Sequence, residues 1–176
     1  MRVISGSARG RRLVAPEGRA TRPTHDRVRE ATFNALWSMG TLDGAAVLDL
    51  FAGSGALGIE ALSRGADRAT FVDHDRAAVR AIEANLATCG LAERATVVPS
   101  AVDRFLATTD QRWDLALVDP PYELPDDDWV ELLDRLPTEV AVLESDRAIE
   151  PPFGWEVLRA KRYGITHVVI AARVAI

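Results

Sequence analysis

The chain has 176 residues and a formal net charge of −5, with 48% hydrophobic and 27% charged residues. These values fit one soluble globular domain, and no apolar run approaches the roughly 18–20 residues that cross a bilayer. The only cysteine, Cys89, excludes an internal disulfide framework, so we expect a cytoplasmic protein. We also expect a monomer with no membrane contact and no metal, since the histidines have no Cys/His cluster around them.

Charge is distributed unevenly along the chain. Residues 1–30 hold eight arginines against three acids, a charge of about +5, which leaves about −10 on the remainder. A basic arm on an acidic body indicates contact with a nucleic acid. The alternative is a solvated charged tail, but the arginines are interspersed with apolar and turn residues and form no plain charge block.

The first predicted elements are a short hairpin and a helix. Extended runs at residues 2–4 and 11–14 flank a glycine-containing link, which predicts a hairpin. A loop follows over residues 16–23, and a helix begins near its N-cap Thr24 and stops at Gly40. The apolar stripe of this helix is Val28, Thr32, Ala35, Leu36 and Met39. The residues expected to contact the nucleic acid are Arg9, Arg11, Arg12, Arg22, Thr24, Arg27 and Arg29.

Residues 46–65, AVLDLFAGSGALGIEALSRG, predict a strand, a glycine turn and a helix N-terminus. Such a junction directs free backbone N–H groups at a ligand, and glycines let the ligand approach the backbone. Gly53, Gly55 and Gly58 match the dinucleotide fingerprint, although a turn without a ligand can show the same pattern.

Two acids at predicted strand ends favour a different ligand from a dinucleotide. Asp49 precedes the glycine turn, where its carboxylate would repel a pyrophosphate but would bind an ammonium group. Asp73 ends the next apolar run, at the position that holds a ribose diol in doubly wound folds. Adenosine joined to an amino acid satisfies both acids, which indicates S-adenosylmethionine.

Strands and helices alternate from residue 45 onward. Such repeated units predict a doubly wound, mostly parallel sheet with helices on both faces. Its ligand should lie at the carboxyl ends of the strands, where Asp49, Asp73, Ser100 and Asp119 fall. The expected strands are 46–50, 69–73, 95–98, 114–118 and 139–144, and the expected helices are 55–64, 75–88, 101–108 and 127–135.

The C-terminal region departs from this alternation. Residues 155–160 and 165–172 are extended around a turn at Gly164, and no helix fits between them. We therefore expect an antiparallel pair, which gives seven strands with an antiparallel last strand.

A buried strand runs directly into Asp119-Pro120-Pro121-Tyr122. The two prolines make this turn rigid, so the Asp119 carboxylate and the Pro120 carbonyl can accept hydrogen bonds from one amino group. An exocyclic base amine is a poor nucleophile, and two acceptors favour a more tetrahedral nitrogen. Tyr122 would stack on the unpaired or flipped base. A plain turn at the end of a strand is the alternative.

Three motifs together resemble the RsmD family. Residues 49–55 resemble the first motif of class I S-adenosylmethionine-dependent methyltransferases, and residues 119–122 resemble the motif of those that methylate exocyclic amino groups. Residues 22–24 and 26–30 complete the resemblance, which covers nearly the whole chain. It implies a Rossmann-like methyltransferase domain at 41–176, an RNA-contacting extension at 1–40, and methylation of a guanine N2 in 16S rRNA, within the small ribosomal subunit or an assembly intermediate. The cofactor contacts it implies are Asp49, Phe51, Gly53, Gly55, Asp73, Ser100 and Ala101.

Other functions stay open on the residues alone. The Asp119 motif does not separate adenine N6 from guanine N2, or DNA from RNA. Relatives often carry Asp or Asn before the alanine that meets the adenine, whereas this chain has Ser100 before Ala101. A non-catalytic RNA-binding assembly factor has no use for the intact motif, and an NAD-dependent dehydrogenase is disfavoured by Asp49 and by the lack of an acid/base for hydride transfer.

Overall fold

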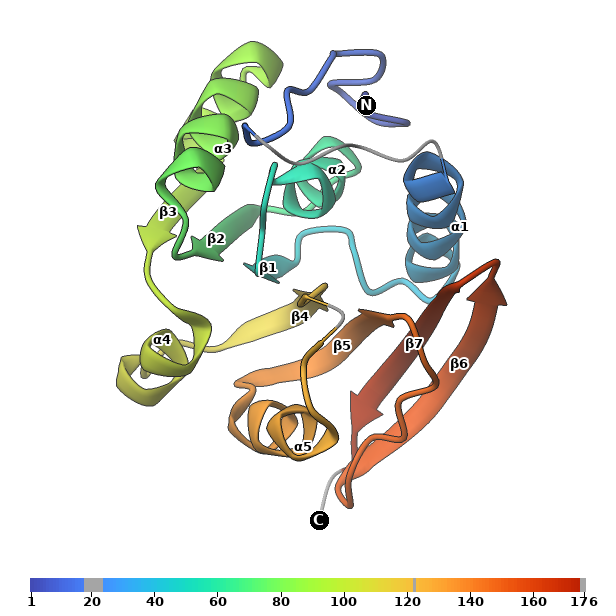
Figure 1. The fold of residues 1–176 in the computed structure, drawn as a ribbon. Helices are drawn as coiled ribbons and strands as arrows, with labels where there is room; N and C mark the ends of the chain where they lie inside the picture. Colours follow the sequence, from blue (N-terminus) through green and yellow to red (C-terminus); the bar gives the residue numbers. More distant parts are fainter. Residues whose placement is uncertain (18–23, 122, 175–176) are drawn as a thin grey trace.

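The computed structural model describes residues 1–17, 24–121 and 123–174, which form a seven-stranded sheet with helices on both faces (Figure 1). The strands are β1 Ala46–Leu50, β2 Arg68–Asp73, β3 Ala95–Pro99, β4 Trp113–Val118, β5 Thr138–Ser145, β6 Trp155–Tyr163 and β7 Thr166–Arg173. The helices are α1 Thr24–Ser38, α2 Ala56–Ser63, α3 Arg76–Cys89, α4 Val102–Thr108, α5 Asp126–Arg135 and the short 3₁₀ helix η1 Ala92–Arg94. Within the described residues, no helix is long and apolar enough to cross a membrane.

The strand order is β3-β2-β1-β4-β5-β7-β6. The first five strands are parallel, and β7 is antiparallel to both of its neighbours, β5 and β6. The expected antiparallel C-terminal pair is therefore confirmed, with β7 inserted between β5 and β6. The chain order reverses between β1 and β4, which is where open α/β sheets form a ligand crevice at the carboxyl ends of their strands.

Two hydrophobic cores lie on opposite faces of the sheet. On the α1–α3 face, the core packs side chains of α1, α2 and α3, such as Phe33, Ile59 and Ile82, against the sheet. On the α4–α5 face, Leu106 and Trp129 pack against the other side. All five residues of β1 are buried, as expected for a parallel strand that is covered on both sides.

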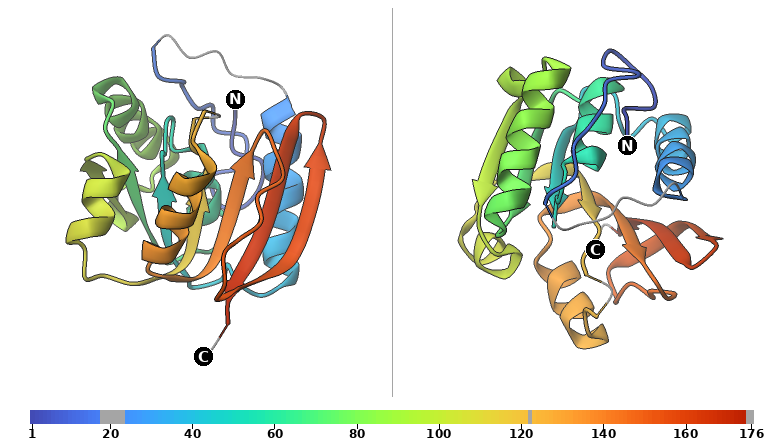
Figure 2. Two further views of the ribbon diagram at one scale, coloured as in Figure 1. Left: turned by 60° about the horizontal axis from the view of Figure 1, so that its bottom comes forward. Right: turned by 45° about the horizontal axis from the view of Figure 1, so that its top comes forward.

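The N-terminal segment, residues 1–17, packs on α2 and α3 (Figure 2). The expected hairpin pairs through a single bridge between Arg2 and Arg12, and the Val3 N–H donates to the Arg11 carbonyl at 3.0 Å. Val3 and Leu13 are buried in the core of the α1–α3 face. This segment and the seven-stranded sheet therefore share one core.

Helix α1 begins at Thr24 as expected and ends at Ser38. Four residues of its predicted apolar stripe are buried, but Met39 lies beyond the helix and is 37% exposed. The fully buried Phe33, which the stripe omitted, packs in the core instead.

Candidate active site

The glycine turn after β1 has a tightly constrained backbone. Phe51, Gly53 and Gly55 have φ values of 56°, 57° and 76°. Only glycine adopts this left-handed region freely, so Phe51 marks a strained position of the kind found at ligand sites. The Ala52 N–H donates to the Val72 carbonyl of β2 at 3.1 Å, and the Gly55 N–H donates to the Ala52 carbonyl at 2.7 Å. The loop is thereby fixed over the ends of β1 and β2.

Asp49 connects β1 to the helix that follows the glycine turn. Its Oδ2 accepts a hydrogen bond from the Gly58 N–H at 2.8 Å, and the residue is 1% exposed. A Cβ on Gly58 would lie 2.3 Å from Phe71 Cε1, so the third glycine of the fingerprint permits close helix–strand packing. One carboxylate oxygen of Asp49 is therefore already engaged within the protein.

Asp73 supports the glycine turn from the end of β2. Its Oδ2 accepts from the Gly53 N–H at 2.9 Å, and its Oδ1 accepts from the Asp75 N–H at 2.9 Å. The two oxygens of a carboxylate offer about four lone-pair sites, so further acceptance by this group remains available. The position matches the ribose-binding acid expected from the sequence.

Ser100 and Ala101 follow β3 beside this acid. The Ser100 N–H donates to the Asp73 carbonyl at 3.0 Å, and the Ser100 hydroxyl donates to the Ala101 carbonyl at 3.0 Å. Because the hydroxyl proton is engaged locally, the Ser100 oxygen is left to act as an acceptor.

The expected catalytic turn follows β4. Asp119 is half-buried, Pro120 is buried and Pro121 is exposed, and the Pro121 carbonyl accepts from the Leu124 N–H at 3.1 Å. Tyr122 lies outside the described residues.

Strand register brings the acids onto one face of the sheet. In β1 and β4, Val47, Leu115 and Leu117 lie in the core of the α1–α3 face. Because side chains alternate along a strand, Asp49 and Asp119 share that face. Burial raises the pKa of Asp49 well above its usual range; the Gly58 hydrogen bond opposes this shift, while the charges of Asp119 and Asp73 add to it. The site is thus an acidic cluster that a cationic ligand would stabilise.

Glu144 is a site residue that the sequence analysis missed. Leu143 of β5 pairs with Val118 of β4, so Glu144 lies beside Asp119 on the same face. Burial, and after it the negative charge of Asp119, raise the pKa of Glu144 to about 8, against the opposing effect of Arg29. An acid that ends an apolar run was the signal that selected Asp49, Asp73 and Asp119, and the same signal could have found Glu144.

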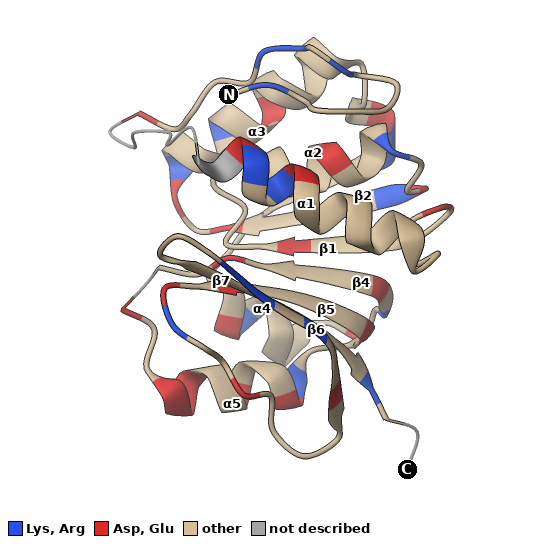
Figure 3. Ribbon diagram, turned by 90° about the vertical axis from the view of Figure 1, so that its right-hand side faces the viewer, with Lys and Arg blue, Asp and Glu red and all other residues tan. Residues whose placement is uncertain are grey.

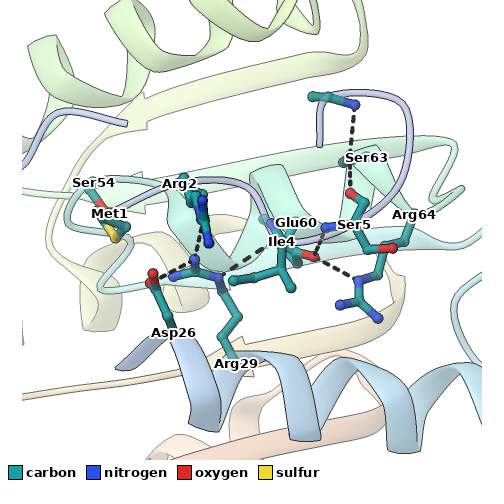
Figure 4. Close-up of polar contacts among 12 residues, drawn as sticks. Met1, Arg2, Ile4, Ser5, Asp26, Arg29, Ser54, Glu60, Ser63 and Arg64 are labelled. Atoms are coloured by element: carbon teal, nitrogen blue, oxygen red, sulfur yellow. Dashed lines mark hydrogen bonds and ion pairs between the residues drawn. The ribbon is translucent and has the colours of Figure 1, made fainter. Parts of the chain in front are cut away.

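Arg29 is a correction to the expected RNA surface. The residue is only 3% exposed. Its Nη2 donates to the Arg2 carbonyl at 2.6 Å and to Asp26 Oδ1 at 3.0 Å, and its Nε lies 3.6 Å from Glu60 Oε2 (Figure 4). The guanidinium is therefore part of the protein interior, and the expectation that it contacts RNA is wrong.

The structure describes the exposure of four of the remaining expected RNA contacts. Arg9, Arg11, Arg12 and Arg27 are exposed. Thr24 is the first residue of α1, and Arg22 lies outside the described residues. No group of three or more His, Cys, Asp or Glu side chains in the described part of the chain could hold a metal ion.

The strand order, the glycine turn and the acids at the strand ends define the class of this protein. It is a methyltransferase with a Rossmann-like fold. The chain belongs to the RsmD family, and the family described as "Conserved hypothetical protein 95" matches residues 1–172.

Individual relatives agree with this assignment. A candidate rRNA methyltransferase of Bacillus subtilis, YlbH, is 40% identical over 184 residues, covering 97% of each chain. The ribosomal RNA small subunit methyltransferase D of Escherichia coli is 47% identical over 122 residues, which cover 69% of this chain and 60% of that protein. The solved structure of a candidate methyltransferase of E. coli, YhhF, has a TM-score of 0.86 at 39% identity and covers 99% of this chain and 98% of that one.

Proposed function

We propose that this protein transfers a methyl group from S-adenosylmethionine to the exocyclic N2 of a guanine in 16S rRNA of the small ribosomal subunit. The observation that carries the proposal is the convergence of Asp49, Asp73 and Asp119 on one face, at the carboxyl ends of adjacent strands. The names of the family relatives support rRNA as the substrate class. The resemblance to the RsmD family supports guanine N2.

The residues present fit the cofactor. S-adenosylmethionine carries positive charge on its sulfonium and ammonium groups, and a cation bound in the acidic cluster would offset the burial and the charge repulsion that raise the pKa of Asp49. The glycine turn would lie under the amino-acid part of the cofactor, and Asp73 would accept hydrogen bonds from the ribose hydroxyls. When bound, the cofactor supplies an electrophilic methyl group.

The protein's own contribution to catalysis lies in the turn after β4. The Asp119 carboxylate and the Pro120 carbonyl would each accept a hydrogen bond from the target amino group. This geometry would direct the nitrogen lone pair toward the methyl donor. It holds the amine in the reactive orientation, so its effect falls on the transition state more than on binding of the ground state.

The test is methyl transfer from S-adenosylmethionine with a tritiated methyl group to small ribosomal subunits and to protein-free 16S rRNA, followed by nucleoside analysis. We expect the label in N2-methylguanosine. Label in N6-methyladenosine would favour the adenine alternative. RNA binding without transfer would favour a non-catalytic assembly factor.

A further inference from the structure

The edge strand β6 carries cations that the proposed function does not use. Arg159, Lys161 and Arg162 lie on a strand whose residues from Glu156 to Arg162 are all exposed. Neither Arg159 nor Lys161 has a carboxylate within 4.0 Å in the part of the chain that the structure describes. These two cations are thus uncompensated on an otherwise acidic body.

Register places these cations on the same face of the sheet as the candidate active site. Lys161 pairs with Val168, and Val168 pairs with Glu144 in β5. Because Glu144 lies beside Asp119, a row across β4, β5, β7 and β6 leads from the catalytic acid to Lys161. Three strand spacings give about 14 Å, the length of about four stacked nucleotides or of fewer in an extended strand.

The cations line a groove between β6 and α1. Its walls include Asn34 and Ser38 of α1 together with Arg159, Lys161 and Tyr163 of β6. Lys161 Nζ lies 5.2 Å from the centre of the Tyr163 ring. Figure 3, which faces this edge of the sheet, shows basic residues along β6 next to α1. Two cations and an aromatic ring, beside the amide of Asn34 and the hydroxyl of Ser38, suit a single-stranded nucleic acid.

We propose that the groove between α1 and β6 is a second RNA-binding surface, which holds the single-stranded RNA that flanks the target nucleotide. This inference rests on the proposed function, because the occupant is the proposed substrate. Charge complementarity and the shared face with Asp119 favour RNA. Together with the exposed arginines of the N-terminal segment, the groove would hold the RNA on both sides of the catalytic turn.

The test compares two double variants that each remove two positive charges. R159A/K161A changes the groove, and R68A/R112A changes two exposed arginines at the amino ends of β2 and β4, the opposite end of the sheet. Binding to 16S rRNA and to small subunits is measured at several salt concentrations. For R159A/K161A we expect weaker binding and a log–log salt slope that is flatter by about 1.4, since each contact on a single strand contributes about 0.7. For R68A/R112A we expect the wild-type slope.

RNA length gives an independent measurement. Fragments centred on the nucleotide that the transfer assay identifies are trimmed progressively on each side. We expect wild type and R159A/K161A to bind equally once the flank that reaches the groove is removed. R159Q/K161Q, which keeps long side chains, serves if the alanine variant does not fold.

The outcomes separate this inference from the proposed function. If wild type methylates rRNA and R159A/K161A retains the wild-type affinity and slope, the groove does not bind RNA and the proposed function stands. If both double variants lose the same affinity, the effect is one of net charge and the groove is likewise excluded. If wild type neither binds nor methylates rRNA, the proposed function fails and this inference fails with it.

Discussion

The substitution Glu144→Gln tests the electrostatics of the acidic cluster through protein stability. Glu144 is 8% exposed, and burial together with the charge of Asp119 raises its pKa from an ordinary value of 4.5 to about 8. The folded protein therefore retains the Glu144 proton up to about pH 8, whereas the unfolded chain releases it near pH 4.5. Between these values the folded state binds more protons, so its stability falls as pH rises.

The size of the effect follows from the same two values. Each pH unit between them costs about 1.4 kcal/mol, so ionisation of Glu144 lowers the free energy of unfolding by up to about 5 kcal/mol. Wild type has its full free energy of unfolding below pH 4.5, loses up to about 5 kcal/mol progressively through the interval, and loses no more above about pH 8. The amide that E144Q introduces does not ionise, so the stability of the variant relative to wild type should increase with pH.

Urea denaturation of wild type and E144Q at about pH 5, 7 and 9 measures this difference. Glu139→Gln is the matched control, because Glu139 is an exposed residue on the same strand. We expect E144Q to gain on wild type by several kcal/mol between the lowest and the highest pH, and E139Q to show no such trend. A difference between E144Q and wild type that stays constant across this range would refute the reasoning.

Three further predictions concern cofactor, chemistry and RNA. Asp73→Ala should weaken binding of S-adenosylhomocysteine by about 1.5–3 kcal/mol, the range for a hydrogen bond to a charged group; calorimetry that shows unchanged affinity in a folded variant would remove Asp73 from the site. Asp119→Ala should abolish methyl transfer while S-adenosylhomocysteine and RNA still bind, because the loss falls on kcat; near-normal turnover would contradict the mechanism. Replacing Arg9, Arg11 and Arg12 together by Ala should leave cofactor affinity intact and flatten the salt dependence of RNA binding by about 2; identical slopes would leave these arginines as a solvated surface.

The sheet could be predicted from the sequence because its signals are local. The expected strand 46–50 coincides with β1, and strand 139–144 lies within β5 Thr138–Ser145. An apolar run that ends in an acid identifies both the strand and its carboxyl end, so the same pattern gave the positions of Asp49 and Asp73. The alternation of strands and helices then gave the architecture.

The burial of Arg29 could not be predicted, because its partners come from other elements. Its guanidinium meets Asp26 one turn earlier, but also Glu60 of α2 and the carbonyl of Arg2. An arginine at the start of an amphipathic helix has the same local pattern whether it faces solvent or a buried carboxylate. The single bridge that joins Arg2 and Arg12 is likewise set by contacts with α2 and α3 rather than by hairpin propensity.

The attachment of the N-terminal segment determines how its role can be studied. Glu60 is fully buried, and its oxygens accept from the Ile4 and Ser5 N–H groups at 2.8 and 3.1 Å (Figure 4). Truncation of this segment would strip a buried carboxylate of two hydrogen-bond donors, and a buried group left without its hydrogen-bond partner costs about 1–3 kcal/mol, more when the group is charged. The segment is therefore not a detachable module. If a shortened protein fails to bind RNA, the cause could be a disrupted α2 and glycine turn rather than the loss of RNA contacts. Substitutions confined to the exposed arginines avoid this ambiguity, because they leave the contacts with α2 intact.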